Sequence, residues 1–173
     1  DFLVAGGKMV LPGGDHIVPN QKAVIDTARK INIPIIYVND AHRPGLKEDR
    51  EFLKRGQHCI EGTWGAEIIE ELKPQEGDEV IGGKCTLCGF NKTNLDELLQ
   101  EGQIKNVVIG GFLTNFCVES TARTAYDKGY GVTIMKDATA AISEEEQNHA
   151  EEKIFPLLGQ TLTVDQFLEQ LEE

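Results

Sequence analysis

Short apolar runs along the chain alternate with longer stretches in which apolar residues recur every three or four positions. The short runs are rich in Val and Ile and predict strands, whereas the longer periodic stretches predict helices. Strands that alternate with helices predict an α/β fold with a parallel sheet. The expected strands span residues 33–38, 78–81, 107–109, 132–135 and 162–164, and the expected helices span residues 19–31, 65–72, 91–100, 117–126, 143–155 and 165–173.

The run 107–109 is the clearest strand, because all three residues are apolar and β-branched. It has the composition of a strand that is buried on both faces. Gly110 and Gly111 follow and allow a sharp turn, after which Thr114 and Asn115 are good residues to cap a helix. The pattern therefore places Cys117 in the first turn of a helix, just beyond the end of a buried strand.

A cysteine at this place has a chemical meaning. The unpaired N–H groups and the dipole at a helix N-terminus stabilise an anion, so they favour the thiolate. The same N–H groups could hold the oxyanion of an acyl-transfer intermediate. The alternative from the residues alone is that Cys117 is a small buried side chain that fills a gap in the core.

The segment 111–118 reads Gly-Phe-Leu-Thr-Asn-Phe-Cys-Val, and residues 121–123 read Thr-Ala-Arg. This combination resembles the nucleophile motif of the isochorismatase-like cysteine hydrolases, which include nicotinamidases, N-carbamoylsarcosine amidases and ureidoacrylate amidohydrolases. The resemblance implies a Rossmann-like, three-layer α/β/α fold with a mostly parallel sheet and a catalytic Cys, Lys and Asp. It also implies that Cys117 is the nucleophile, that the N–H groups of Leu113 and Cys117 form the oxyanion hole, and that the peptide before Leu113 is cis.

The segment 84–90, Lys-Cys-Thr-Leu-Cys-Gly-Phe, resembles the lysine motif of the same family. The resemblance implies that Lys84 places a positive charge beside the thiolate, although the family's usual Tyr-Ser before Gly-Phe is replaced here by Leu87 and Cys88. From the residues alone, Lys84 is an ordinary solvated charge. Cys85 and Cys88 form a single pair, whereas a structural zinc site usually needs two.

The start of the chain resembles the end of a family motif. Asp1 and Phe2 match the last two residues of the family motif Asp-x-x-x-Asp-Phe. The first aspartate of that motif is the catalytic acid and base. The resemblance also implies that Phe2 contacts the substrate. The resemblance implies that this catalytic aspartate lies four residues before Asp1, and that the first strand precedes residue 1. We therefore expect residues 1–173 to be one domain that is truncated at its N-terminus. The rival interpretation is that Asp1 itself is the acid.

Asp40 and His42 follow the strand expected at 33–38, and His58 follows later. All three match the metal-binding positions of nicotinamidases in order, so the resemblance implies one divalent ion and no organic cofactor. Two imidazoles and a carboxylate suit zinc, iron or manganese. The alternative is that Asp40 and His42 hydrogen-bond to loop backbone.

Residues 43–55 are expected to form a charged loop at the rim of the pocket. Arg55 stands where nicotinamidases often carry an aromatic residue, which puts nicotinamide in doubt as the substrate. Its guanidinium could bind a substrate carboxylate through two hydrogen bonds, or it could be a surface charge. Trp64 could form a wall of the pocket or simply pack against the protein.

Composition excludes some classes of partner. The 173 residues carry a formal net charge of -12, which argues against nucleic acid, and no apolar run reaches the length of a membrane span. Without a secretory context, we interpret the cysteines Cys59, Cys85, Cys88 and Cys117 as reduced thiols in the cytoplasm. We also expect a homo-oligomer, either a dimer or a tetramer.

These observations lead to one functional hypothesis with two alternatives. We expect a cysteine amidohydrolase that cleaves the C–N bond of a small carboxamide through a thioester, as nicotinamidases do. A ureidoacrylate or N-carbamoyl amidase is the first alternative. A catalytically silent binding subunit with the same fold is the second, and the reactivity of the Cys117 thiol would distinguish it.

Overall fold

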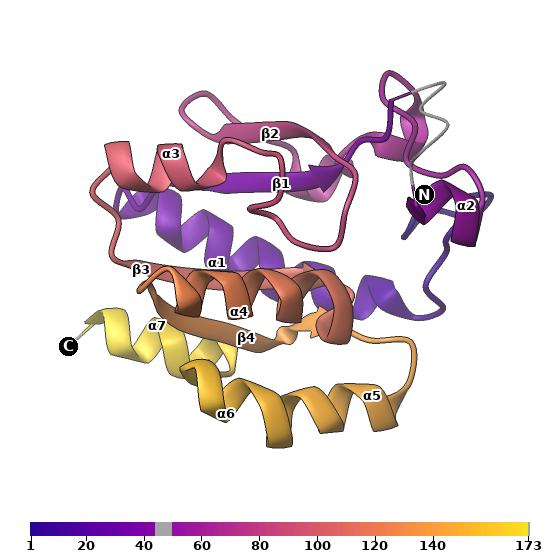
Figure 1. Cartoon of the computed structure of the whole chain (residues 1–173). Coiled ribbons are helices and arrows are strands. Elements are labelled where there is room, and N and C mark those ends of the chain that lie inside the picture. The colour runs from indigo at the N-terminus through magenta and orange to yellow at the C-terminus, as the bar shows by residue number, and fades with distance from the viewer. Residues whose placement is uncertain (44–49, 173) are drawn as a thin grey trace.

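The computed structural model describes residues 1–43 and 50–172. Its strands pair only in parallel and helices connect them, which confirms the predicted α/β class. Two sheets are present in the described chain (Figure 1). One sheet contains β1 (Ile36–Asp40) and β2 (Glu79–Lys84), and the other contains β3 (Asn106–Phe112), β4 (Gly131–Ala140) and β5 (Gln160–Leu162).

Helices cover both faces of the three-stranded sheet. In Figure 1, α4 lies in front of β3 and β4, while α1 and α7 pass behind them. The helices are α1 (Val18–Lys30), α2 (Arg50–Arg55), α3 (Leu95–Glu101), α4 (Glu119–Asp127), α5 (Glu144–His149), α6 (Phe155–Leu158) and α7 (Val164–Glu172). This arrangement gives the expected three layers around the larger sheet.

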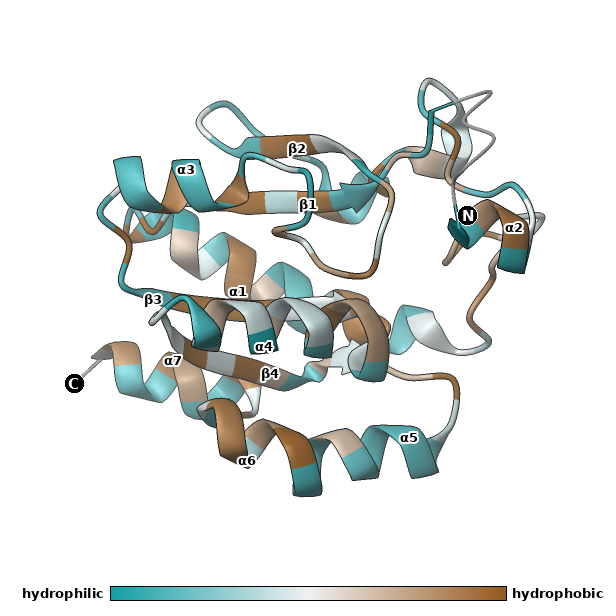
Figure 2. Ribbon diagram, viewed as in Figure 1, coloured by the Kyte–Doolittle hydropathy of each residue, from teal (hydrophilic) through white to brown (hydrophobic). Residues whose placement is uncertain are grey.

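The core follows from the alternation of side chains along β4. Val132 and Ile134 pack with Val118 and Ala122 on the α4 side. Further along the strand, Met135 packs on the other side with residues of α1 and α7. Figure 2 shows the same division, because apolar residues are concentrated on the strands and on the helix faces turned towards them. Burial of both faces therefore fixes the orientation of β4 and of the loop that follows it.

Side-chain contacts join the two sheets on both faces. The rings of Phe90 and Tyr130 stack with their centroids 6.1 Å apart, and both rings pack against the core clusters of the two sheets. On the other side, Arg29 of α1 hydrogen-bonds to Asp78 and to the hydroxyl of Tyr37 in β1. No strand pairing links β1 to β3 among the residues that the structure describes.

The structure differs from the sequence prediction in the strands. Val108 is 42% exposed rather than buried on both faces, because β3 is an edge strand of the described sheet. β4 runs on to Ala140, well beyond the strand expected at 132–135, since Gly111 and Phe112 pair with Thr139 and Ala140. Polar residues in that segment concealed the strand. The first strand begins at Ile36 rather than at residue 33.

The helices differ in three places. The helix expected at 65–72 is two short 3₁₀ turns, Trp64–Ala66 and Glu70–Leu72, because extended backbone at Glu67 and Ile69 separates them. The helix expected at 143–155 contains a π-helical segment, Ala150–Ile154, between α5 and α6. The rim loop expected at 43–55 contains helix α2, and its residues 44–49 lie outside the described part.

Candidate active site

The cysteine predicted as the nucleophile lies on a tight turn at the end of β3. The peptide between Phe112 and Leu113 is cis, as the resemblance implies. A π-helical turn, Thr114–Val118, then carries Cys117 into α4, in place of the ordinary helical turn expected from the sequence. The carbonyl of Leu113 accepts hydrogen bonds from the N–H groups of Phe116 and Val118, at 3.0 and 3.2 Å. These bonds close the turn around the thiol.

A network of hydrogen bonds centred on Gln147 fixes this turn against β4. The Thr114 hydroxyl donates to Oε1 of Gln147 at 2.7 Å, and the same oxygen accepts from the N–H of Ala141 at 2.9 Å. The Gln147 amide nitrogen donates to the carbonyl of Lys136 and to Thr139 Oγ1. Gln147 thus ties the nucleophile turn to the carboxyl end of β4. Sequence reasoning missed it, because a glutamine on a polar helix carries no visible signal.

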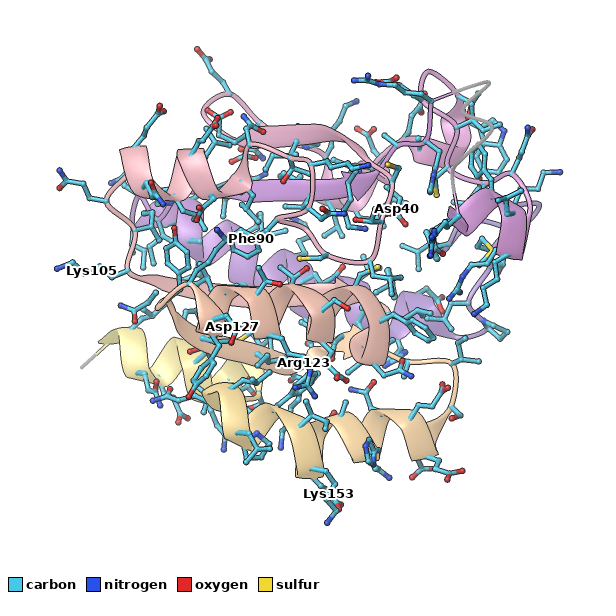
Figure 3. All side chains as sticks on the ribbon, in the orientation of Figure 1. Asp40, Phe90, Lys105, Arg123, Asp127 and Lys153 are labelled. Carbon is cyan, nitrogen blue, oxygen red and sulfur yellow. The ribbon has the colours of Figure 1, made fainter. Side chains whose placement is uncertain are left out.

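Lys84 and Asp40 lie opposite the thiol. They end the neighbouring parallel strands β2 and β1, where they are register partners, and Figure 3 shows Asp40 at that end of β1. The ammonium of Lys84 donates to the Asp40 carboxylate and lies 3.6 Å from Cys117 Sγ. The structure therefore brings together the cysteine and lysine of the predicted triad. The contact between Asp40 and Lys84 was not expected from the sequence.

Burial and charge set the protonation of these groups. Burial raises the pKa of the Cys117 thiol, and neither the charge of Lys84 nor the hydrogen bond from the Leu113 backbone fully offsets it. Burial disfavours the ammonium of Lys84, but Asp40 and Cys117 outweigh this effect and raise the pKa of Lys84. The resting pair is thus a neutral thiol beside an ammonium, and a base must remove the thiol proton during attack.

Asp40, His42 and His58 form a cluster with the donor types of a metal site. Their ligand atoms lie within 4.8 Å of one another, and both imidazoles are buried. Backbone pairing brings the two histidines together, because His42 exchanges hydrogen bonds with Cys59 and Glu61. Nδ1 of His58 is 2.9 Å from the carbonyl of Gly56, which leaves Nε2 for an ion. The three residues therefore fit a divalent metal.

Asp1 has a different environment from the one expected of a catalytic acid. Its carboxylate accepts hydrogen bonds from the N–H groups of Cys59 at 2.7 Å and Lys8 at 3.1 Å, and its amino group donates to Gly65. Asp1 thus anchors the segment that carries His58, and it does not line the pocket. These contacts do not support the rival interpretation that Asp1 is the acid.

The pocket above the thiol contains most of the predicted substrate-binding residues. Phe2 lines it and stacks on Phe112, with ring centroids 6.3 Å apart. Arg55 also lines it, over the ring of Phe116 at 4.9 Å and with Nε 2.9 Å from Glu51. Trp64 does not line the pocket and is 53% exposed, so it does not form the pocket wall that the sequence allowed.

Several residues of the pocket gave no signal in the sequence, because loops that are far apart along the chain bring them together. They are Met9, Glu51, Thr86, Leu87 and Phe116. All four cysteines are free thiols, and burial raises the pKa of Cys59 to about 11. None of the helices in the described residues has the length and apolar character needed to cross a membrane.

Comparison with known proteins places this geometry in context. A family model described as "Isochorismatase domain" matches residues 1–166. The uncharacterised isochorismatase family protein YwoC of Bacillus subtilis is 36% identical, over 90% of this chain and 84% of its own length. Nicotinamidase 3 of Arabidopsis thaliana is 35% identical over 75% of this chain and 66% of its own length. Ureidoacrylate amidohydrolase RutB of Rhizobium rhizogenes is 33% identical over 80% of this chain and 65% of its own length.

Solved structures agree with these matches. An isochorismatase-like hydrolase from Alkaliphilus metalliredigens superposes with a TM-score of 0.90 at 33% identity, covering 98% of this chain and 92% of that one. A pyrazinamidase of Pyrococcus horikoshii in complex with zinc superposes with a TM-score of 0.81 at 27% identity, covering 92% of both chains.

Proposed function

Because the chain belongs to the isochorismatase domain family, whose relatives are hydrolases of C–N bonds other than peptide bonds, we propose that it is a cysteine amidohydrolase with nicotinamidase-like chemistry. The carrying observation is the position of the Cys117 thiol. It lies 3.6 Å from the Lys84 ammonium, just after the turn that begins at Leu113. A partly buried thiol with a cation beside it, at the start of a helical segment, has the parts of an acyl-transfer site.

The proposed reaction starts with attack of Cys117 Sγ on the carbonyl carbon of a small carboxamide. The N–H groups of Leu113 and Cys117 donate hydrogen bonds to the carbonyl oxygen as negative charge develops on it, and Lys84 adds a fixed positive charge beside it. The C–N bond then breaks, the nitrogen leaves as ammonia with a proton from an acid, and a thioester remains. Water hydrolyses the thioester to release the carboxylic acid and restore the thiol.

The group that takes the thiol proton and gives a proton to the leaving nitrogen still has to be assigned. Asp40 and Glu51 are the carboxylates that line the described pocket, and they are engaged by Lys84 and Arg55 respectively. We therefore propose that an aspartate on a further parallel strand, placed between β1 and β3, serves as the acid and base. Among the described residues, β1 pairs only with β2, and β3 pairs only with β4. The other edge of each of these two strands has no strand partner there.

Asp40, His42 and His58 would hold the divalent metal that the proposal includes. Oδ1 of Asp40 accepts from Lys84, so Oδ2 remains to face an ion. When bound, zinc, iron or manganese would supply a positive charge that orients a polar group of the substrate. A cytoplasmic location and a homo-oligomeric state remain predictions.

A ureidoacrylate or N-carbamoyl amidase is the second candidate, and Arg55 is the observation that favours it. Its guanidinium lies in the pocket and is a fitting partner for a substrate carboxylate. Ammonia release across a panel of carboxamides and ureido acids, with and without Cys117→Ser, tests both candidates. A wild-type protein that releases no ammonia and whose Cys117 does not react with a small alkylating agent would instead be a binding subunit.

A further inference from the structure

Two cavities of very different size share a wall, and Cys117 lines the smaller one. The cavity directly above the thiol has a volume of about 30 Å³, which leaves room for roughly two water molecules. The neighbouring cavity has a volume of about 460 Å³. Glu51, Thr86 and Leu87 line both, so the two spaces share a wall. The small cavity can hold a carboxamide or ureido head, but it cannot hold the whole of a larger substrate.

The larger cavity is lined mainly by polar side chains. Arg50 and Lys92 contribute two cations to it, and Ser120 adds a hydroxyl. The amide of Asn91 donates to Thr86 Oγ1 at 3.1 Å, which fixes both side chains at the wall. The full lining is Arg50, Glu51, Cys85, Thr86, Leu87, Cys88, Asn91, Lys92 and Ser120. These polar groups suit a charged end of a ligand, and the apolar surface between them suits a short carbon chain.

The charge of this cavity is opposite to that of the chain as a whole. The protein carries a formal net charge of -12, so most of its surface repels anions. Within the part of the chain that the structure describes, neither Arg50 nor Lys92 forms an ion pair. The one acidic residue of the lining, Glu51, lies 2.9 Å from Arg55 Nε and is neutralised by it. Two cations therefore remain to attract a negatively charged group.

We infer that the larger cavity binds the carboxylate end of an elongated amide substrate, whose carboxamide or ureido head enters the small cavity at Cys117. This inference rests on the proposed amidohydrolase function and names its substrate class. The body of the substrate passes over Thr86 and Leu87, and its carboxylate lies near Arg50 and Lys92. The enzyme then prefers acidic amides with a short chain between the two ends over a compact aromatic amide.

The test compares an acidic amide with its neutral isostere. Glutaramate carries a carboxylate where glutaramide carries a second amide, so the two differ only in the charge of the tail. In the wild type we expect glutaramate to have a KM at least about tenfold lower, because two charge-assisted contacts are available. The double variant Arg50→Gln/Lys92→Gln should lose this preference, so that its KM values for glutaramate and glutaramide agree within about twofold.

The matched control is the double variant Lys54→Gln/Lys105→Gln, which removes the same net charge. Lys54 belongs to the same helix as Arg50 but lines neither cavity, and Figure 3 places Lys105 at the end of the molecule away from Asp40. We expect this variant to keep the preference for glutaramate. Equal KM shifts in both double variants would show that only long-range charge acts, and would overturn the inference.

A binding measurement separates this inference from the proposed function. Calorimetry with Cys117→Ser protein measures the affinity for glutaramate and glutaramide without turnover. Tighter binding of glutaramate that disappears with Arg50→Gln/Lys92→Gln supports the cavity even if no amide is hydrolysed. Equal affinity for the two compounds refutes the inference and leaves the amidohydrolase proposal to the ammonia assay.

Discussion

The two sheets hold their parts of the site by different means. The β3–β4–β5 sheet places Cys117 through a packed core, in which Val118, Ala122 and Phe155 are fully or almost fully buried. The β1–β2 sheet has a smaller core around Ile81, every residue of β1 is partly exposed, and an ion pair joins Asp40 to Lys84 at the end of the sheet. The nucleophile therefore depends on packing, whereas its cation depends on an ion pair. Changes in charge or pH should disturb the β1–β2 sheet before they disturb the β3–β4–β5 sheet.

Replacement of Cys117 should have the largest effect on activity and the smallest on structure. We expect Cys117→Ser to lower ammonia release by roughly 10³-fold or more, because a hydroxyl is far harder to ionise than a thiol. Its free energy of unfolding should change by less than about 1 kcal/mol, since the core around Val118 is unaltered. Cys85→Ser is the control and should keep full activity. Near-normal ammonia release by Cys117→Ser would refute the nucleophile.

Extension of the chain should have the next largest effect. If an aspartate-bearing strand lies between β1 and β3, a chain extended upstream of Asp1 should melt at a higher temperature and release ammonia faster than residues 1–173 alone. The reason is that the added strand would pair both open edges and supply the acid. Differential scanning calorimetry and the ammonia assay make the comparison. Equal melting and equal rates in the two forms would show that the acid lies elsewhere.

Removal of the Lys84 charge should affect both stability and activity. Lys84→Met leaves Asp40 in a largely buried place without its partner, so we expect a loss of about 3 kcal/mol in the free energy of unfolding. The pKa of Cys117 should rise further, which moves the pH profile of its alkylation to higher pH. The double variant Asp40→Asn/Lys84→Met should regain stability without regaining activity. An unchanged alkylation profile in Lys84→Met would contradict the proposed role of the ammonium.

The next prediction concerns the metal site formed by Asp40, His42 and His58 beside the end of β1. Protein purified without chelator should contain about one equivalent of zinc, iron or manganese by elemental analysis. His42→Ala and His58→Ala should lose it, whereas His149→Ala, on exposed α5, should retain it. Removal by chelator should lower the melting temperature, because bound metal stabilises the folded state. Absence of metal from the wild type, with no effect of chelator, would reject the site.

The smallest effect should come from the pair that ties α1 to β2. Burial alone would raise the pKa of Asp78, but its hydrogen bonds from Arg29 and from the Gln75 backbone outweigh this and lower it. Because the pKa of Asp78 is lower in the folded state than in the unfolded chain, the pair stabilises the fold fully above the unfolded-state pKa, near pH 4. This stabilisation is lost as the pH falls through the folded-state pKa. Arg29→Met should therefore cost about 1 kcal/mol at neutral pH. Chemical denaturation at several pH values should show this cost shrinking below about pH 4.

The sequence predicted the parts of the fold that depend on local pattern. The strand at 107–109 and the position of Cys117 just beyond it were found from apolar residues followed by a helix signal, although Gly110 and Gly111 belong to β3 and the turn begins after them. Family motifs pointed to Lys84 and to the cluster of Asp40, His42 and His58. Contacts between distant segments could not be predicted in this way. Gln147 has no local signature, and the pairing of Asp40 with Lys84 depends on the register of β1 and β2. The strand at 137–140 was missed because its partner, rather than its composition, makes it a strand.

The protonated state of Cys117 has a consequence for the chemical durability of the protein. Peroxides and other oxidants react with the thiolate rather than the thiol. Because burial raises the pKa of Cys117, its sulfur is shielded from oxidation until a base removes the proton during catalysis. Cys59, with a pKa of about 11, is shielded in the same way. A protein with this chemistry should withstand oxidative conditions that inactivate hydrolases whose nucleophile is a permanent thiolate.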